Sequence, residues 1–308
     1  MRFFMTSLLL FIAITIHAQT IYSKAFGNPE NKAVIFLHGG PGYNSSTFEF
    51  TTAQKLADAG FYVITYDRRG EGRSVDTKAK YTFQETFDDL NSLYKQYNIK
   101  QATLIGHSFG GIVATLYAKK QAKNVANIIL VGAPISLQNT FKTIIKTSKE
   151  IYTTKDDKTN LNYINMLENM DTTSIEYSSY SFMHAMQNGF YTPKEMSDKA
   201  KNIYAQFGTN EELKKYSSQM GYEAPQGFWE NENYTTIDLK PSIKLLLEKG
   251  VKIYSLYGKD DGLYSTKQID DLKKLIGESN LQYLDNCSHS VFIDQQTLFI
   301  KAIKDWLK

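Results

Sequence analysis

The sequence lacks several features that mark common classes of protein. Its 308 residues include a single cysteine, Cys287, so no intrachain disulfide can form in any compartment. The formal net charge of +3 selects neither a nucleic acid nor a membrane surface as a partner. No internal repeat or low-complexity segment interrupts the chain. With 42% hydrophobic and 22% charged residues, the composition is that of a globular protein, and the length fits one core with an insertion.

A long membrane-spanning run is also missing, and the longest apolar stretch lies at the N-terminus. Arg2 precedes apolar residues 3–16, which are fewer than the ~20 that a membrane span needs. The stretch ends at Ala18, before Gln19, in a pattern typical of a signal peptide. We therefore expect residues 1–18 to be cleaved near Ala18, leaving a periplasmic or secreted protein without stable membrane association. An uncleaved N-terminal anchor is the alternative, whereas a lipid anchor is not expected because no cysteine follows the stretch.

Glycine-rich nucleotide-binding motifs are absent as well, although a glycine-flanked serine is present. The sequence GHSFG at residues 106–110 is followed by no Gly-Lys-Ser/Thr, and its glycines do not fit the dinucleotide pattern. It stands between a strand-like run at 102–105 and a helix-like run at 112–120. This context predicts a sharp strand-to-helix turn that lifts Ser108 above a sheet, with the Phe109 amide aimed at an oxyanion. On the pattern alone, a chance match is an equal alternative.

Strand-like and helix-like patterns alternate along most of the chain. Continuous apolar runs at 33–37, 61–66, 102–105, 127–131, 251–257 and 281–284 predict buried parallel strands, with an edge strand at 21–26. Helices are predicted near 52–59, 83–97, 266–276 and 294–307. This alternation predicts an α/β fold with a doubly wound, mostly parallel sheet. Residues 135–243 show only amphipathic helical patterns, so we expect a helical cap inserted into a core of residues 19–134 and 244–308.

A serine hydroxyl needs a base within hydrogen-bond reach, and His289 is the best placed of five histidines. It follows the last predicted strand, in NCSHS at 286–290, on the sheet edge where the other loops converge. The others are less suitable: His17 in the signal segment, His38 opening a glycine-rich loop, His107 pointing away from Ser108, and His184 in the cap.

The acid that orients the base is expected after the strand at 251–257, where the loop GKDDG spans 258–262. We choose Asp261, because a residue three positions after Gly258 can face the histidine loop. Asp260 is the alternative and would otherwise serve as a solvated or loop-stabilising acceptor.

A second oxyanion donor is expected from HGGPG at residues 38–42, whose glycines leave backbone N–H groups accessible. Gly40 is our choice, because Pro41 has no N–H; a tight turn alone would explain the same residues. Arg68 and Arg73 are expected to be structural and to tie Asp67 and nearby loops together.

The combination of HGGPG at 38–42, DRRGEGRS at 67–74 and GHSFG at 106–110 resembles the α/β-hydrolase superfamily, and within it the prolyl iminopeptidase branch. The resemblance covers the sheet portion well and the cap poorly. It implies a Ser108, Asp261 and His289 triad, an oxyanion hole from Gly40 and Phe109, and a cap over the site. Phe109 departs from the tryptophan common in that branch, and a histidine rather than a glycine stands at position 107.

The resemblance implies a serine hydrolase acting through an acyl-enzyme on small peptides or amides with a free N-terminus, without metal or organic cofactor. A buried ammonium must be paired, so Glu230 and Glu232 are the candidates to hold it, with Trp229 lining an apolar pocket. A solvated charged face is the alternative for both glutamates. An ester or lactone hydrolase and a non-catalytic ligand-binding protein are the alternative functions. Epoxide and haloalkane chemistry is disfavoured because its elbow nucleophile is normally a carboxylate.

Overall fold

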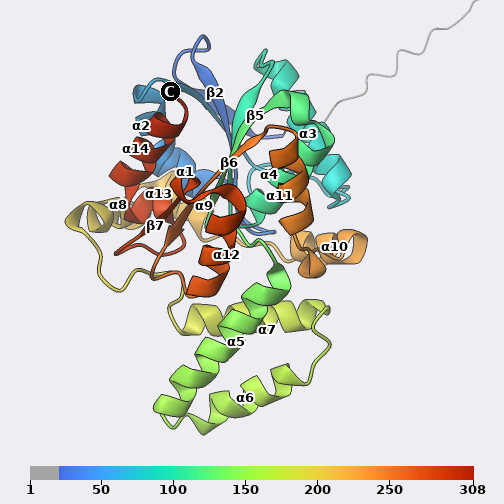
Figure 1. Ribbon diagram of the computed structural model, residues 1–308, viewed down its shortest axis with the longest axis vertical. Coiled ribbons are helices and arrows are strands. Elements are labelled where there is room, and N and C mark those ends of the chain that lie inside the picture. Colours follow the sequence, from blue (N-terminus) through green and yellow to red (C-terminus); the bar gives the residue numbers. More distant parts are fainter. Residues whose placement is uncertain (1–20) are drawn as a thin grey trace, which may run out of the picture.

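The computed structural model describes residues 21–308 and contains a seven-stranded sheet in the order β1-β3-β2-β4-β5-β6-β7 (Figure 1). Only β1 is antiparallel to its neighbour. The strands are β1 (Ser23–Phe26), β2 (Lys32–Leu37), β3 (Phe61–Tyr66), β4 (Ala102–His107), β5 (Val125–Val131), β6 (Lys252–Gly258) and β7 (Leu281–Leu284). The predicted α/β fold with a mostly parallel sheet is confirmed. The predicted signal peptide lies outside the described residues.

Helices cover both faces of the sheet, and side chains alternate between the two faces. On β2, Ile35 and Leu37 pack into one core and Val34 and Phe36 into the other. The first core is covered by α3 (Phe83–Gln96), α4 (Phe109–Lys120), α11 (Lys240–Glu248) and α12 (Thr266–Ile276), and the second by α2 (Gln54–Asp58), α13 (Val291–Asp294) and α14 (Gln296–Trp306). Burial on both faces explains why the strands are continuous apolar runs.

The insertion between β5 and β6 is helical, as expected. Its elements are α5 (Leu137–Thr154), α6 (Lys158–Glu168), α7 (Ile175–Gln187), α8 (Asp198–Thr209), α9 (Glu211–Ser217), α10 (Glu223–Glu232) and the 3₁₀ turn η3 (Tyr234–Thr236). Figure 1 shows α5, α6 and α7 projecting from the sheet as a lobe, whereas α8 and α9 lie against the core near α1 (Ser46–Phe48) and α13.

The two ends of the insertion meet at a short neck. The Leu239 amide donates to the Ile135 carbonyl at 2.7 Å, and Ser136 forms an antiparallel bridge with Asp238. The next helix, α11, begins at Lys240 and packs against α4 of the core. The neck therefore lies at residues 135–136 and 238–239, and residue 243, the predicted end of the cap, lies within α11.

Helix ends differ from the expectations in two places. The helix predicted at 52–59 starts earlier, since α1 and a π-helical turn, η1 (Glu49–Ala53), precede α2. The helix predicted at 294–307 corresponds to α14 and is preceded by the short α13, with a break at Gln295. Two 3₁₀ turns, η2 (Ala122–Asn124) and η4 (Glu278–Asn280), complete the elements. Between residues 21 and 308, none of the helices combines the length and apolarity needed to cross a bilayer.

Candidate active site

Ser108 occupies the sharp turn between β4 and α4. Its backbone has φ 52° and ψ −124°, a strained conformation for a non-glycine residue, and its amide donates to Val131 O at 2.9 Å. A Cβ at Gly106 would lie 2.5 Å from Gly110 O, and one at Gly110 would lie 2.1 Å from Leu37 O. The turn can close only with glycine at both positions, which accounts for the GHSFG pattern.

His289 and Asp261 form a buried pair at the ends of β7 and β6. His289 Nδ1 lies 2.8 Å from Asp261 Oδ2, and the other carboxylate oxygen accepts from the Leu263 amide at 3.1 Å. The side chains are 7% and 1% exposed, respectively. A carboxylate at Nδ1 fixes the proton on that nitrogen and leaves Nε2 with its lone pair, as a general base requires.

The end of β5 lies between Ser108 and His289. The Ser108 amide bonds to Val131, and a Cβ on the next residue, Gly132, would lie 3.1 Å from His289 Nδ1. The two loops therefore meet at one strand end. Within residues 21–308, however, the Ser108 hydroxyl forms no hydrogen bond, so the bond to the base is not made in this state. Such bonds are often long in unliganded sites and tighten with substrate.

The other described histidines have different partners. His107 Nε2 lies 3.1 Å from His289 O, and burial, together with the neighbouring His289, lowers the pKa of His107 to about 3. His38 Nε2 accepts from the Arg68 amide at 3.0 Å, and burial and Arg68 hold its pKa well below the usual value. In the cap, His184 Nδ1 lies 2.9 Å from the Tyr152 hydroxyl.

Asp260 has the loop-stabilising contacts considered as its alternative role. Its amide donates to Cys287 O at 2.8 Å, which joins the β6 and β7 loops. Its carboxylate accepts from the Lys194 amide at 3.2 Å, which connects the core to the cap segment before α8.

Gly40 and Phe109 line the same cavity as Ser108. Among residues 21–308, neither backbone amide donates a hydrogen bond to another residue. The neighbouring Gly39 lies close to Ser108: a Cβ added at Gly39 would be 3.1 Å from Ser108 Cβ. Both amides are therefore available beside the hydroxyl, which is the arrangement that an oxyanion hole needs.

A fully buried Arg68–Glu71 pair supports the glycine-rich loop. Arg68 Nε and Nη2 donate to Glu71 at 2.8 and 2.9 Å, and its guanidinium donates to His38 O and Gly39 O at 2.5 Å each. Glu71 also accepts from the Gly42 amide at 2.8 Å. Arg68 thus ties two neighbouring loops together, as expected, and does so through Glu71 rather than Asp67. No periodic pattern indicated this brace, because residues 68–71 lie in a turn and not in a helix.

Arg73 has the contacts expected of it. Its Nε donates to Asp67 Oδ2 at 2.7 Å, and its Nη2 lies 3.1 Å from Glu49 Oε2.

The cavity at Ser108 is small, and no charged side chain from residues 21–308 lines it. Its volume is about 20 Å³, room for roughly one water molecule. The lining residues are mostly apolar: Gly40, Ser108, Phe109, Ile112, Pro134, Leu137, Thr140, Phe182, Tyr234, Leu263 and Tyr264. The Thr140 hydroxyl is buried without a hydrogen-bond partner among residues 21–308. Because α5 and α7 contribute to this lining, admission of a substrate requires the cap to move.

The structure does not bring the predicted amine-binding residues to this cavity. Glu230 is exposed and accepts from Gln226 at 2.6 Å. Glu232 accepts from the Phe83 amide at 2.7 Å, at the start of α3. The indole of Trp229 donates to Thr173 O at 2.8 Å. Position in the cap sequence suggested these residues, but their partners are all away from Ser108.

Asp294 is a buried carboxylate that the sequence did not single out. It accepts from the Ser288 amide and from the Tyr204 hydroxyl, both at 2.8 Å, and so connects the histidine loop to α8. Burial raises its pKa to about 6, although both hydrogen bonds oppose the rise. No local motif indicated this role, because Tyr204 lies 90 residues away in the sequence.

We expect Asp294→Asn to make the stability of the protein less dependent on pH. A carboxyl whose pKa rises from 3.8 to about 6 on folding favours the folded state at low pH, and this contribution is lost as pH rises through about 6. The amide keeps only one of the two acceptor oxygens but does not titrate, so the free energy of unfolding of the variant relative to the parent should be higher at pH 8 than at pH 4 by about 2–3 kcal/mol. Urea unfolding of the parent and the variant at pH 4, 6 and 8 measures the difference in their free energies of unfolding. A difference that is the same at all three pH values would contradict the assignment.

No cluster of three or more His, Cys, Asp or Glu side chains in the described part of the chain is arranged to hold a metal ion. The polar groups at Ser108 are instead those used in acyl transfer: a hydroxyl, an imidazole–carboxylate pair and two unpaired amides.

Comparison with known proteins agrees with this geometry. Residues 32–296 match the family model described as alpha/beta hydrolase fold. A proline iminopeptidase of Pestalotiopsis fici is 26% identical over 94% of this chain and 96% of its own. A proline iminopeptidase-related protein from Thermus thermophilus superposes with a TM-score of 0.67 at 21% identity, covering 93% of this chain and 92% of the other. An esterase from Exiguobacterium antarcticum gives 0.62 at 19% identity, covering 93% and 94%. The chain belongs to the α/β-hydrolase fold family.

Proposed function

We propose that the protein is a serine hydrolase in which Ser108 attacks an acyl carbonyl and forms an acyl-enzyme. His289 takes the hydroxyl proton and delivers it to the leaving group, while Asp261 holds the imidazole tautomer. The amides of Gly40 and Phe109 stabilise the oxyanion, and water then hydrolyses the acyl-enzyme. The observation that carries the proposal is the position of the strained Ser108 turn. It is bonded to the end of β5, and the same strand end lies against the buried His289–Asp261 pair.

The substrate class favoured by the lining of the Ser108 cavity is a small, uncharged carboxylic ester. A free amine buried beside Ser108 would need a carboxylate partner, and no charged side chain lines this cavity among residues 21–308. Glu230 and Glu232 are engaged elsewhere. An aminopeptidase acting on substrates with a free N-terminus is the second candidate, favoured by the similarity to proteins named proline iminopeptidases.

A parallel assay separates the two candidates. We expect kcat/KM for p-nitrophenyl acetate and butyrate to exceed that for proline and alanine p-nitroanilides by about 100-fold, since an unpaired buried polar group costs about 1–3 kcal/mol. Glu230→Gln should leave ester turnover unchanged. Faster turnover of the proline anilide, reduced by Glu230→Gln or Glu232→Gln, would support the aminopeptidase instead.

Thr140 is expected to select acyl groups that carry a polar atom. Thr140→Val removes the unpaired hydroxyl at nearly constant volume, so the preference for p-nitrophenyl methoxyacetate over the butyrate should fall by about 5–10-fold. The ratio of the two kcat/KM values measures this, and Thr115→Val is the control, because the Thr115 hydroxyl bonds within α4 to Gly111 O. An unchanged ratio in Thr140→Val would exclude a substrate contact.

We further propose that the chain is exported and cleaved near Ala18. An apolar stretch preceded by one basic residue supports this, while residues 1–20 lie outside the described part of the structure. Mass spectrometry of the protein from culture medium or periplasm should give an N-terminus near Gln19. Recovery of intact Met1 would contradict it.

A further inference from the structure

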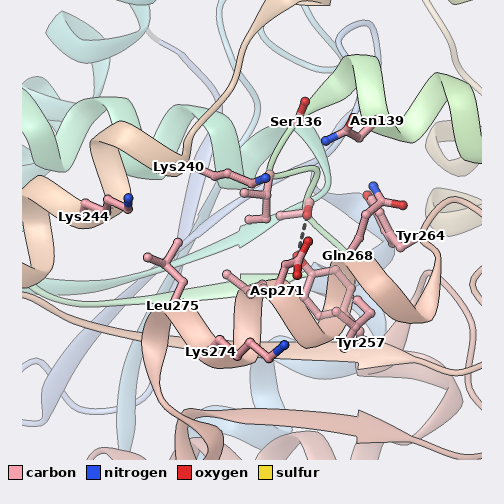
Figure 2. A pocket seen from close by; sticks show the side chains of 14 residues that line it. Ser136, Asn139, Lys240, Lys244, Tyr257, Tyr264, Gln268, Asp271, Lys274 and Leu275 are labelled. Atoms are coloured by element: carbon pink, nitrogen blue, oxygen red, sulfur yellow. Dashed lines mark hydrogen bonds between the residues drawn. The ribbon is translucent and has the colours of Figure 1, made fainter.

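Figure 2 shows a second cavity, of about 370 Å³. It shares Tyr264 with the Ser108 cavity. It is bounded by the β5–α5 connection, by α11 and by α12. Ala133 and Ile135 line this cavity, whereas Pro134, between them in the chain, lines the Ser108 cavity. The two spaces are therefore neighbours on opposite sides of one wall.

The floor of this second cavity is apolar. It is formed by Ile135, Ile269, Leu272, Leu275 and the ring of Tyr257. The hydroxyls of Tyr257 and Tyr264 are both engaged, because they donate to Ala133 O and Gly132 O at 2.5 and 2.7 Å. A ligand on this floor thus meets hydrocarbon and ring surface, and the volume is in the range of small-molecule sites.

The rim carries three ammonium groups, from Lys240 and Lys244 on α11 and from Lys274 on α12 (Figure 2). None of the three forms a salt bridge or side-chain hydrogen bond with residues 21–308. Asp271 supplies the one carboxylate of the lining, and its Oδ2 is bonded to Lys267 at 2.9 Å. That hydrogen bond, and then the charges of Lys267, Lys240 and Lys274, lower the pKa of Asp271. The rim therefore retains an excess of positive charge.

We propose that this cavity binds an amphipathic carboxylate with an alkyl chain of about eight to ten carbons. The tail lies on the apolar floor, and the carboxylate lies among the ammonium groups of Lys240, Lys244 and Lys274. Each exposed ion pair raises affinity only a few-fold, so the three lysines together give about a tenfold preference for a carboxylate, and each buried methylene raises affinity by roughly fourfold.

The experiment measures decanoate binding by calorimetry, using protein whose Ser108 is blocked by a phosphonate. Blocking keeps decanoate out of the Ser108 cavity, so the binding that remains is assigned to the second cavity. We expect saturable decanoate binding that weakens at least tenfold in the triple variant Lys240→Gln, Lys244→Gln, Lys274→Gln. Decanol should bind alike to both proteins, and acetate should not bind, because it has no tail.

A matched triple variant, Lys95→Gln, Lys100→Gln, Lys123→Gln, changes the net charge equally at exposed positions outside the cavity. It should bind decanoate within twofold of the parent protein. Three outcomes would overturn the proposal: no saturable binding, equal weakening in both triple variants, or unchanged binding after removal of the rim lysines. The Leu275→Asp variant is a second check, since a carboxylate on the floor should abolish decanoate binding while Leu275→Met preserves it.

Discussion

Ser108→Ala should lower kcat for ester hydrolysis by about 10⁶-fold, because it removes the nucleophile of the proposed mechanism. Alanine lacks only the hydroxyl, which forms no hydrogen bond among residues 21–308, so the variant should fold normally. Serine and alanine at position 108 would both have the strained φ of 52°, so backbone strain should not distinguish the variant from the parent. Initial rates with p-nitrophenyl butyrate and labelling by a fluorophosphonate probe measure the effect.

A matched control is Ser92→Ala, on the exposed face of α3, which removes a hydroxyl bonded to Asp88 O and should retain full labelling. Labelling that persists in Ser108→Ala, or activity within tenfold of the parent, would reassign the nucleophile. In that case decanoate binding to the second cavity would be measured without a phosphonate block.

Asp261→Asn has the second largest expected effect, a fall in kcat of about 10⁴-fold. The amide is nearly isosteric and leaves the buried site filled, but its NH₂ group favours an imidazole with the proton on Nε2. That tautomer cannot accept the Ser108 proton. Far-ultraviolet circular dichroism should show an unchanged fold, while ester turnover shows the loss.

Asp260→Asn is the control for this prediction, because the neighbouring carboxylate bonds to the Lys194 amide rather than to His289. Its kcat should stay within about fivefold of the parent. If Asp260→Asn instead caused the greater loss, the acid would have to be reassigned.

Local sequence patterns were sufficient for the sheet and for the turn at Ser108. Continuous apolar runs located the strands because burial on both faces demands them, and the glycines around Ser108 reflect contacts with atoms close in the sequence or on the adjacent strand. The Asp261–His289 pairing followed from chain order, because the ends of β6 and β7 lie side by side.

The cap could not be derived in the same way, because its helices are oriented by long-range packing. Phe228 of α10 packs against Phe109 and Phe83, with ring centroids 5.1 and 5.6 Å apart. Glu232, one turn further on, shares that face and reaches the Phe83 amide, whereas Glu230 lies on the opposite, exposed face. Nothing in the local sequence specifies which face of α10 meets the core.

The neck at Ile135 and Leu239 has a consequence for how such a protein can diversify. The chain segments at Ile135 and Leu239 are hydrogen-bonded to each other. The inserted cap therefore leaves and rejoins the core at a single point. A segment of different length or sequence can be grafted there without changing the spacing of β5 and β6. The cap above Ser108 can thus change during evolution while the proposed catalytic residues on the sheet keep their positions.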